Sequence, residues 1–304
     1  MKKSCLSFVL AALVFLLGSC GGGGSTANGS TVSEQESSNA EQPADGRTVD
    51  ENAANEHTIR VGVVGAFSSH WNLISEMVAD QGINIEIVSF SDYFTPNMAL
   101  SDGELDLNAF QHHAFLANEI AANGYEIEYI AETFVGQLNL FHNKSRISSL
   151  EDLQDGHTIG IPGDQVNGDR ALRVLESAGL IVLDAPEGGI VSRLDIAEYV
   201  VDINIVEAES GMLAGMLPDM EAAVINGDNA FTAGLNPDYD SIFRENVAQE
   251  RFKQYTNLVV ARSEDVRENG ERMRVFRTIV DAFHSDEVRQ FILEEYGGVY
   301  IPVW

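Results

Sequence analysis

The order of apolar and polar positions divides residues 58–304 into alternating strands and helices. Apolar residues at every second position, or in short unbroken runs, predict strands. These lie at 58–64, 83–90, 103–109, 125–131, 135–141, 158–161, 204–208, 222–225 and 257–261. Apolar residues at helical spacing, with suitable capping residues, predict helices. These lie at 70–80, 96–101, 111–123, 150–153, 167–178, 212–216, 271–283 and 286–295. Such alternation favours α/β lobes with mostly parallel sheets.

Clusters of polar and aromatic residues follow four of the predicted strands. They occupy 91–97, 108–113, 165–170 and 226–229. Ligands of α/β folds bind beyond the carboxyl ends of the strands. Aromatic rings, amides and a single arginine are groups that suit a small zwitterion with an apolar tail. Taken alone, this composition suggests such a ligand but does not identify it.

The N-terminal segment predicts export and a lipid anchor. Lys2 and Lys3 precede an apolar run from Leu6 to Leu17, which is too short to span a bilayer as a helix and is typical of a secretory signal peptide. The following residues, 17–20, read Leu-Gly-Ser-Cys and resemble a bacterial lipobox. The resemblance implies a signal peptide over 1–19 and a lipid on Cys20. Residues 20–57 contain almost no large apolar side chain and predict a flexible tether.

Charge and cysteine content narrow the possible partners. The chain has 18 basic and 47 acidic residues and a net charge of −29. This balance argues against nucleic acid or an anionic lipid surface as a partner. Of the two cysteines, Cys5 lies in the predicted signal peptide and Cys20 in the lipobox. The exported body would then have neither a thiol nor a disulfide.

Three motifs behind the lipobox carry a family resemblance. The chain reads NAFQH at 108–112, Asn-x-x-Arg-Ala-Leu at 167–172 and AVIN at 223–226. In this order they resemble the methionine-binding lipoproteins of ABC importers, the NlpA type, over 58–304. The resemblance implies an α/β fold of the two-lobed periplasmic-binding-protein clamshell type with two hinge crossovers. We expect one lobe at 58–141 plus 259–304, the other at 142–258, and the crossovers near 138–141 and 257–260.

The resemblance also implies a function and roles for individual residues. The protein would capture methionine and deliver it to a permease and its ATPase, without a cofactor and without catalysis. Arg170 would bind the ligand carboxylate, because a guanidinium matches a carboxylate in two places. Asn226 would accept from the amino group. The remaining predicted contacts are the aromatic residues around the thioether and two further polar residues: Tyr93, Phe110, His112, Asn167 and Asp228.

Several departures leave alternatives open. Asp228 stands where the family usually has Asn, and Asn229 where it often has an aromatic residue. Segments 67–71 and 135–139 also differ from the family pattern, and both are expected near the cleft or a crossover. The ligand could therefore be another amino acid or a methionine-containing dipeptide. Metal capture by His112 and His113 is a weaker alternative, because adjacent residues seldom ligate one ion together. Hydrolase and dinucleotide-binding motifs are lacking from the sequence.

Overall fold

The computed structural model describes residues 57–66, 68–185, 189–247 and 250–304. The predicted signal peptide, Cys20 and all but the last residue of the predicted tether lie outside these ranges. That last residue, His57, already pairs with Ile83 at the start of a sheet. In the ranges described, we find no helix long and apolar enough to cross a membrane.

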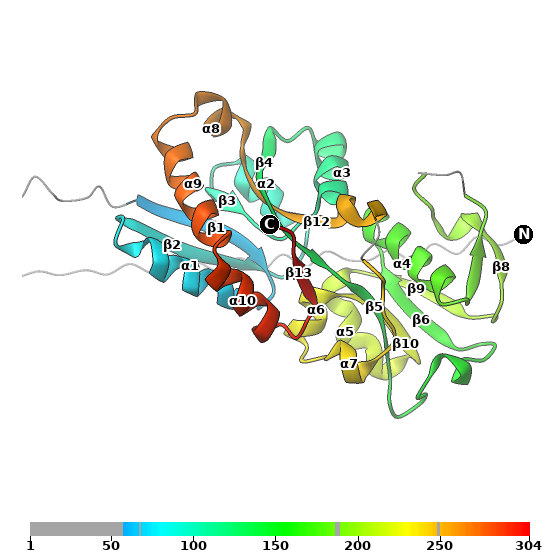
Figure 1. The fold of residues 1–304 in the computed structure, drawn as a ribbon. Helices are drawn as coiled ribbons and strands as arrows, with labels where there is room; N and C mark the ends of the chain where they lie inside the picture. Colours follow the sequence, from blue (N-terminus) through cyan, green and yellow to red (C-terminus); the bar gives the residue numbers. More distant parts are fainter. Residues whose placement is uncertain (1–56, 67, 186–188, 248–249) are drawn as a thin grey trace, which may run out of the picture. The chain divides into compact units, whose positions relative to one another are not determined.

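The first sheet has six strands, in the order β13-β4-β12-β3-β1-β2 (Figure 1). Its strands are β1 (His57–Val64), β2 (Ile83–Phe90), β3 (Leu107–Asn108), β4 (Ile127–Gly136), β12 (Thr256–Arg262) and β13 (Tyr300–Pro302). Its helices are α1 (Ser69–Ala79), α2 (Thr95–Ser101), α3 (His113–Asn123), α8 (Ser263–Glu268), α9 (Glu271–Phe283) and α10 (Asp286–Glu295).

Alternation along the strands gives this sheet two buried faces. In β12, Val259 and Ala261 join the core formed with α1, α9 and α10, whereas Leu258 and Val260 join the core formed with α2 and α3. Successive side chains of a strand point to opposite faces, so one apolar run fills both layers. The sheet is therefore fixed from both sides, and its strand ends are rigid supports for a site.

The second sheet has five strands, in the order β11-β5-β10-β6-β9. Its strands are β5 (Leu138–His142), β6 (Thr158–Pro162), β9 (Asn204–Ala208), β10 (Ala222–Asn226) and β11 (Ser241–Phe243). Its helices are α4 (Gln165–Ser177), α5 (Leu213–Met216), α6 (Gly227–Thr232) and α7 (Pro237–Asp240). In β10, Ala222 and Val224 pack on the side of α4, whereas Ala223 and Ile225 pack on the side of α5 and α6.

Short elements complete the chain. The pair β7 (Ile181–Leu183) and β8 (Ile196–Tyr199) forms a separate antiparallel sheet that the sequence pattern did not predict. Single 3-10 turns are η1 (Leu150–Asp152), η2 (Arg193–Asp195), η3 (Ser210–Met212) and η4 (Leu217–Asp219), and η5 (Glu250–Tyr255) is longer. Ser149 and Ser192 begin η1 and η2 with capping boxes.

The prediction of mostly parallel sheets is wrong. The pairs β1–β2, β1–β3, β6–β9 and β6–β10 are parallel, but β12 runs antiparallel to β3 and β4, and β5 runs antiparallel to β10 and β11. The reason is the path of the chain. It enters the second sheet along β4 and β5 and returns along β12, so the returning strand must oppose β4.

The change of sheet can be located from the strand pairing. β4 ends at Gly136 in the first sheet and β5 begins at Leu138 in the second, so Gln137 alone joins them. The return falls between β11 and Thr256, because Thr256 already pairs with Val135 of the first sheet. Both positions precede the segments 138–141 and 257–260 that we expected from the sequence. The lobe bounds 58–141 plus 259–304 and 142–258 remain a prediction.

Candidate functional site

One cavity beside Gln137 brings together every residue predicted to bind ligand. It contains about 420 Å³ of empty space, including space open to solvent. The predicted residues that line it are Tyr93, Phe110, His112, Asn167, Arg170, Asn226 and Asp228. Other lining residues are Gln111, Phe115, Gly136, Gln137, Gly227, Asn257 and Tyr300. The predicted residues lie at or after the carboxyl ends of β2, β3, β6 and β10, so both sheets supply them, as the rule for α/β sites leads one to expect.

An aromatic group forms one wall of the cavity. The rings of Tyr93 and Phe110 are stacked, with centroids 6.0 Å apart and planes 21° from parallel. Phe115 meets both of them edge-on, and Val166 of α4 belongs to the same buried cluster. The cluster thus joins segments of the first sheet to a helix of the second. Its stacked rings offer an apolar surface on which an aliphatic or thioether chain can lie.

Tyr93 is held by two residues of the second sheet's side of the cavity. Its hydroxyl donates to both carboxylate oxygens of Asp228, each at 2.7 Å, and accepts from Asn229 Nδ2 at 2.9 Å. Burial, together with the neighbouring Asp228 charge, raises the pKa of Tyr93 well above its usual value. Burial also raises the pKa of Asp228, although the hydrogen bond from Tyr93 opposes this rise. Asn229 therefore helps to orient the Tyr93 ring.

Arg170 is paired inside the protein. Its Nε donates to Glu245 Oε1 at 2.8 Å, its Nη2 donates to Glu245 Oε2 at 2.5 Å, and Nη2 also donates to Gly136 O at 2.7 Å. Both side chains are only 5% exposed. Tyr255 lies beneath the guanidinium, 4.3 Å from its Cζ to the ring centroid. Asp169, which precedes Arg170 in the sequence, pairs instead with Arg173.

Helix α4 presents Asn167 and Arg170 one turn apart. Asp164 caps the helix and accepts from Val166 N and Asn167 N, and its carboxylate also accepts from Asn167 Nδ2. This fixes the amide of Asn167, whose Oδ1 accepts from Asn226 Nδ2 at 3.0 Å. Asn226 Oδ1 is buried and has no hydrogen-bond partner among the described residues. An acceptor oxygen is thereby left for a donor that enters the cavity.

His112 is fixed as a neutral ring at the start of α3. Its Nδ1 accepts from Phe115 N at 3.1 Å, so the proton of the neutral ring lies on Nε2, which is 3.5 Å from Asn167 Oδ1. Burial, and then the nearby charge of Arg170, lowers the pKa of His112 to about 3. His112 is also the N-cap of α3, a role that histidine seldom takes. For this reason the predicted helix began at 111 instead of His113.

The structure corrects one further expectation about this region. His70 and Trp71, expected near the cleft, belong instead to the first sheet's core, where Trp71 is fully buried and His70 packs against Phe134 and Phe283. Within the described ranges, no group of three or more His, Cys, Asp or Glu side chains could hold a metal ion.

Sequence reasoning missed two polar residues: Gln137, which lines the cavity, and Glu245, which pairs with Arg170. Glu245 follows β11 in an irregular segment and lies 75 positions from Arg170, so no local pattern connects them. Gln137 stands in a segment noted only for its departure from the family pattern. Its position between β4 and β5 would have been informative if the boundary of those strands had been predicted correctly.

A mixed two-sheet α/β body with a polar and aromatic cavity at its sheet crossover is the arrangement of a substrate-binding protein. The sequence profile of the NlpA lipoprotein family matches residues 59–304. The chain belongs to this family.

Named relatives and solved structures agree with this assignment. The D-methionine-binding lipoprotein MetQ of Escherichia coli is 35% identical over 250 residues, covering 81% of this chain and 88% of the relative. Outer membrane lipoprotein 3 of Mannheimia haemolytica is 36% identical, covering 81% and 90%. The substrate-binding protein of a methionine transporter from Streptococcus pneumoniae is 34% identical with a TM-score of 0.76, covering 81% and 96%. A nutrient-binding protein from Burkholderia cenocepacia bound to methionine is 32% identical with a TM-score of 0.73, covering 81% and 100%.

Proposed function

We propose that this protein captures methionine outside the cytoplasmic membrane and delivers it to the permease and ATPase of an ABC importer. The family assignment supports this proposal, as do the relatives named for methionine binding. The observation that carries it is the content of the cavity. The cavity contains a stacked aromatic pair, an arginine and an unpartnered amide oxygen, and both sheets contribute residues to it.

Each part of methionine has a suitable counterpart in the cavity. The thioether chain would lie against Tyr93 and Phe110, where sulfur–ring contact adds about 0.3–1.5 kcal/mol to burial. The ammonium group would reach Asn226 Oδ1 and Asp228. The ligand carboxylate would bind Arg170. Because Glu245 already accepts from the Arg170 guanidinium, the ligand would have to share that guanidinium with Glu245 or displace Glu245 from it. His112 and Asn167 would complete the polar wall.

Binding requires no bond to be made or broken, so we assign the protein no catalytic step and no cofactor. Because the ligand would touch residues carried by both sheets, it would stabilise one relative position of the sheets over others, which a permease can recognise. The lipid on Cys20 belongs to this proposal and would hold the body at an envelope membrane.

The second candidate ligand is another amino acid or a methionine-containing dipeptide. Asp228 favours it, because a carboxylate in place of the family's usual amide strengthens binding at the ammonium end. It also adds negative charge, which disfavours a free α-carboxylate nearby. A dipeptide moves its carboxylate one residue away from this point. The metal-capture alternative finds no suitable ligand group in the described part of the chain.

A thermal-shift screen of the purified full chain tests the proposal. The protein is unfolded and refolded to remove bound ligand, then heated with each amino acid in both enantiomers, with methionine dipeptides and with divalent metals. A ligand at about 1,000 times its Kd stabilises by about 4 kcal/mol, which raises Tm by several degrees. We expect methionine to give the largest shift. A response to metals alone, or to no compound in the panel, would refute the proposal.

A further inference from the structure

The connection between the two sheets carries a side chain with an unused acceptor. Gln137 is the one residue between β4 and β5. Its Nε2 donates to Glu245 O at 3.2 Å, and its backbone N donates to Val299 O at 3.2 Å. The amide is therefore oriented, and its oxygen points away from Glu245 O. That oxygen, Oε1, is buried and has no hydrogen-bond partner among the described residues.

Gln137 lies one position along the strand pairing from Asn226, the residue that carries the other unpartnered oxygen of the cavity. Asn226 pairs with Leu138 in the β5–β10 ladder, one position from Gln137. A Cβ atom at Gly227 would lie 3.3 Å from Gln137 O. Gln137, Asn226 and Asp228 all line the same cavity. The strand pairing thus brings together, in the lining of one cavity, the residues that carry two unpartnered amide oxygens and one carboxylate.

Leaving two acceptors buried without partners is unfavourable, at about 1–3 kcal/mol each. A ligand that supplies their donors regains this free energy, and a primary ammonium group has three N–H donors. The three acceptors are Gln137 Oε1, Asn226 Oδ1 and the Asp228 carboxylate, which retains acceptor capacity beside its bond from Tyr93. The three acceptors match the three donors of an ammonium group in number and type.

We propose that Gln137 is a specificity-determining residue that accepts a hydrogen bond from the ligand's ammonium group. The cavity accordingly selects a primary ammonium and discriminates against N-alkylated ligands. This inference rests on the proposed function, since it assigns the ammonium end of the same site. It adds a residue that the family motifs do not contain, in the segment 135–139 where this chain departs from the family pattern.

Isothermal titration calorimetry on the full chain tests the assignment. It measures the affinity for two ligands, the more tightly bound enantiomer of methionine and the N-methyl analogue of that enantiomer. Gln137→Met keeps the length of the side chain and removes the acceptor. A hydrogen bond to a charged donor contributes enough that its loss weakens binding roughly tenfold to a hundredfold. We expect this loss of affinity for methionine and a much smaller loss for N-methylmethionine. The affinities of Gln137→Met for the two ligands should therefore differ by no more than a few-fold. Gln154→Met, the same change at an exposed position, should alter neither affinity.

Equal affinities of Gln137→Met and the parent protein for methionine would overturn the proposal. So would equal losses for both ligands, which would indicate a structural role. If the variant does not fold, the parent protein still decides, because N-methyl and N,N-dimethyl methionine must bind progressively more weakly. Binding of another primary amine instead of methionine would refute the proposed ligand alone, and the same comparison would then be made with that amine. Binding of no primary amine would refute both.

Discussion

At the scale of single residues, the main feature is that Arg170 already has a carboxylate partner. Glu245 accepts hydrogen bonds from Nε and Nη2 of Arg170, and the ring of Tyr255 packs against the face of the Arg170 guanidinium. Both side chains of this ion pair are only 5% exposed, so removing either partner would leave a buried charge unpaired and would strongly destabilise the protein. Glu245 also accepts from Leu138 N at 2.9 Å, directly after the change of sheet. The pair therefore has two effects, since it stabilises the crossover and sets what a ligand carboxylate must compete with.

Glu245→Gln separates these two effects. The change leaves Arg170 buried without a full counter-charge, so the ligand-free protein should lose up to about 3–5 kcal/mol in its free energy of unfolding. A ligand carboxylate then becomes the only counter-charge, and the Tm increase caused by methionine should be larger than in the parent protein. Denaturant unfolding and thermal shift measure the two quantities. Glu86→Gln, an exposed change of the same kind, should affect neither. An unchanged response to methionine would show that Glu245 does not compete at the site.

The individual residues also show how far the sequence could lead. Arg170, Asn226 and the aromatic residues stand in recognisable motifs, and their shared cavity was predictable from the ends of strands. Glu245 and Gln137 were not predictable as a pair of partners, because their contacts depend on the path of the chain between sheets. Motifs record which residues recur, whereas unpartnered atoms such as Gln137 Oε1 appear only when the packing is known.

At the scale of elements, long periodic segments were predicted more closely than short ones. The strand Ile83–Phe90 and the helices Glu271–Phe283 and Asp286–Glu295 have the predicted bounds. The short strands β7, β8 and β11 were missed, because three or four residues cannot display a period. The boundary of β4 was misplaced, because its last residues continue into β5 with a single residue between them. Tertiary pairing, and not local pattern, ends that strand.

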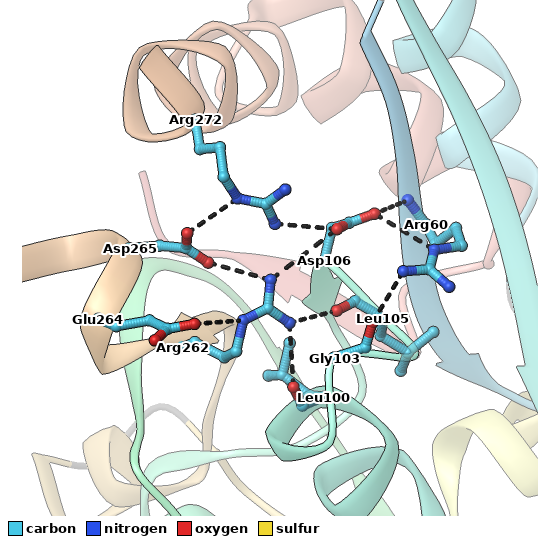
Figure 2. A network of polar contacts seen from close by, with 9 residues as sticks. All are labelled: Arg60, Leu100, Gly103, Leu105, Asp106, Arg262, Glu264, Asp265 and Arg272. Atoms are coloured by element: carbon cyan, nitrogen blue, oxygen red, sulfur yellow. Dashed lines mark hydrogen bonds and ion pairs between the residues drawn. The ribbon is translucent and has the colours of Figure 1, made fainter. Parts of the chain in front are cut away.

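A network of charges ties several elements of the first sheet together (Figure 2). Asp106 accepts from Arg60 N at 2.7 Å and from Arg272 Nη2 at 2.9 Å, which joins β1 to α9. Asp265 pairs with Arg272 and with Arg262 at the end of β12. Burial alone would raise the pKa of Asp106, but the hydrogen bonds and charges of Arg60 and Arg272 hold it below its usual value. The carboxylate is therefore ionised at neutral pH, and its hydrogen bonds connect β1 with α9.

Asp106→Ala should accordingly be among the most destabilising single changes in this sheet. It leaves the charges around it without their shared partner, and we expect a loss of about 3–5 kcal/mol in the free energy of unfolding. Glu264→Ala is the matched control, because Glu264 is 65% exposed and pairs with Arg262 at 3.5 Å. An exposed pair contributes only about 0–1 kcal/mol. Chemical denaturation measures both variants, and equal small losses would show that the network contributes little.

At the scale of the whole molecule, two histidines make stability depend on pH. Burial lowers the pKa of His70 to about 3, and burial together with Arg170 does the same for His112. His70 is held by Tyr296, whose hydroxyl lies 2.9 Å from its Nδ1. Both rings thus stay neutral in the folded protein, although each takes up a proton near pH 6.5 once the chain unfolds. Because the unfolded chain takes up these protons and the folded protein does not, the free energy of unfolding is highest above the unfolded pKa of about 6.5 and decreases as the pH falls below it.

The free energy of unfolding should therefore fall by about 2 kcal/mol per buried histidine between pH 7 and pH 5. Asp228 and Glu119 oppose this trend, because their raised pKa values let the folded state take up protons first. The contribution of one histidine is isolated by comparing the parent with His70→Gln, which cannot be protonated. Denaturant unfolding should show that His70→Gln is less stable than the parent at both pH 7 and pH 5. Between pH 7 and pH 5, however, its free energy of unfolding should fall by about 2 kcal/mol less than that of the parent. An identical pH dependence in the two proteins would mean that His70 takes up its proton in the folded state as well, which its complete burial and its hydrogen bond to Tyr296 argue against.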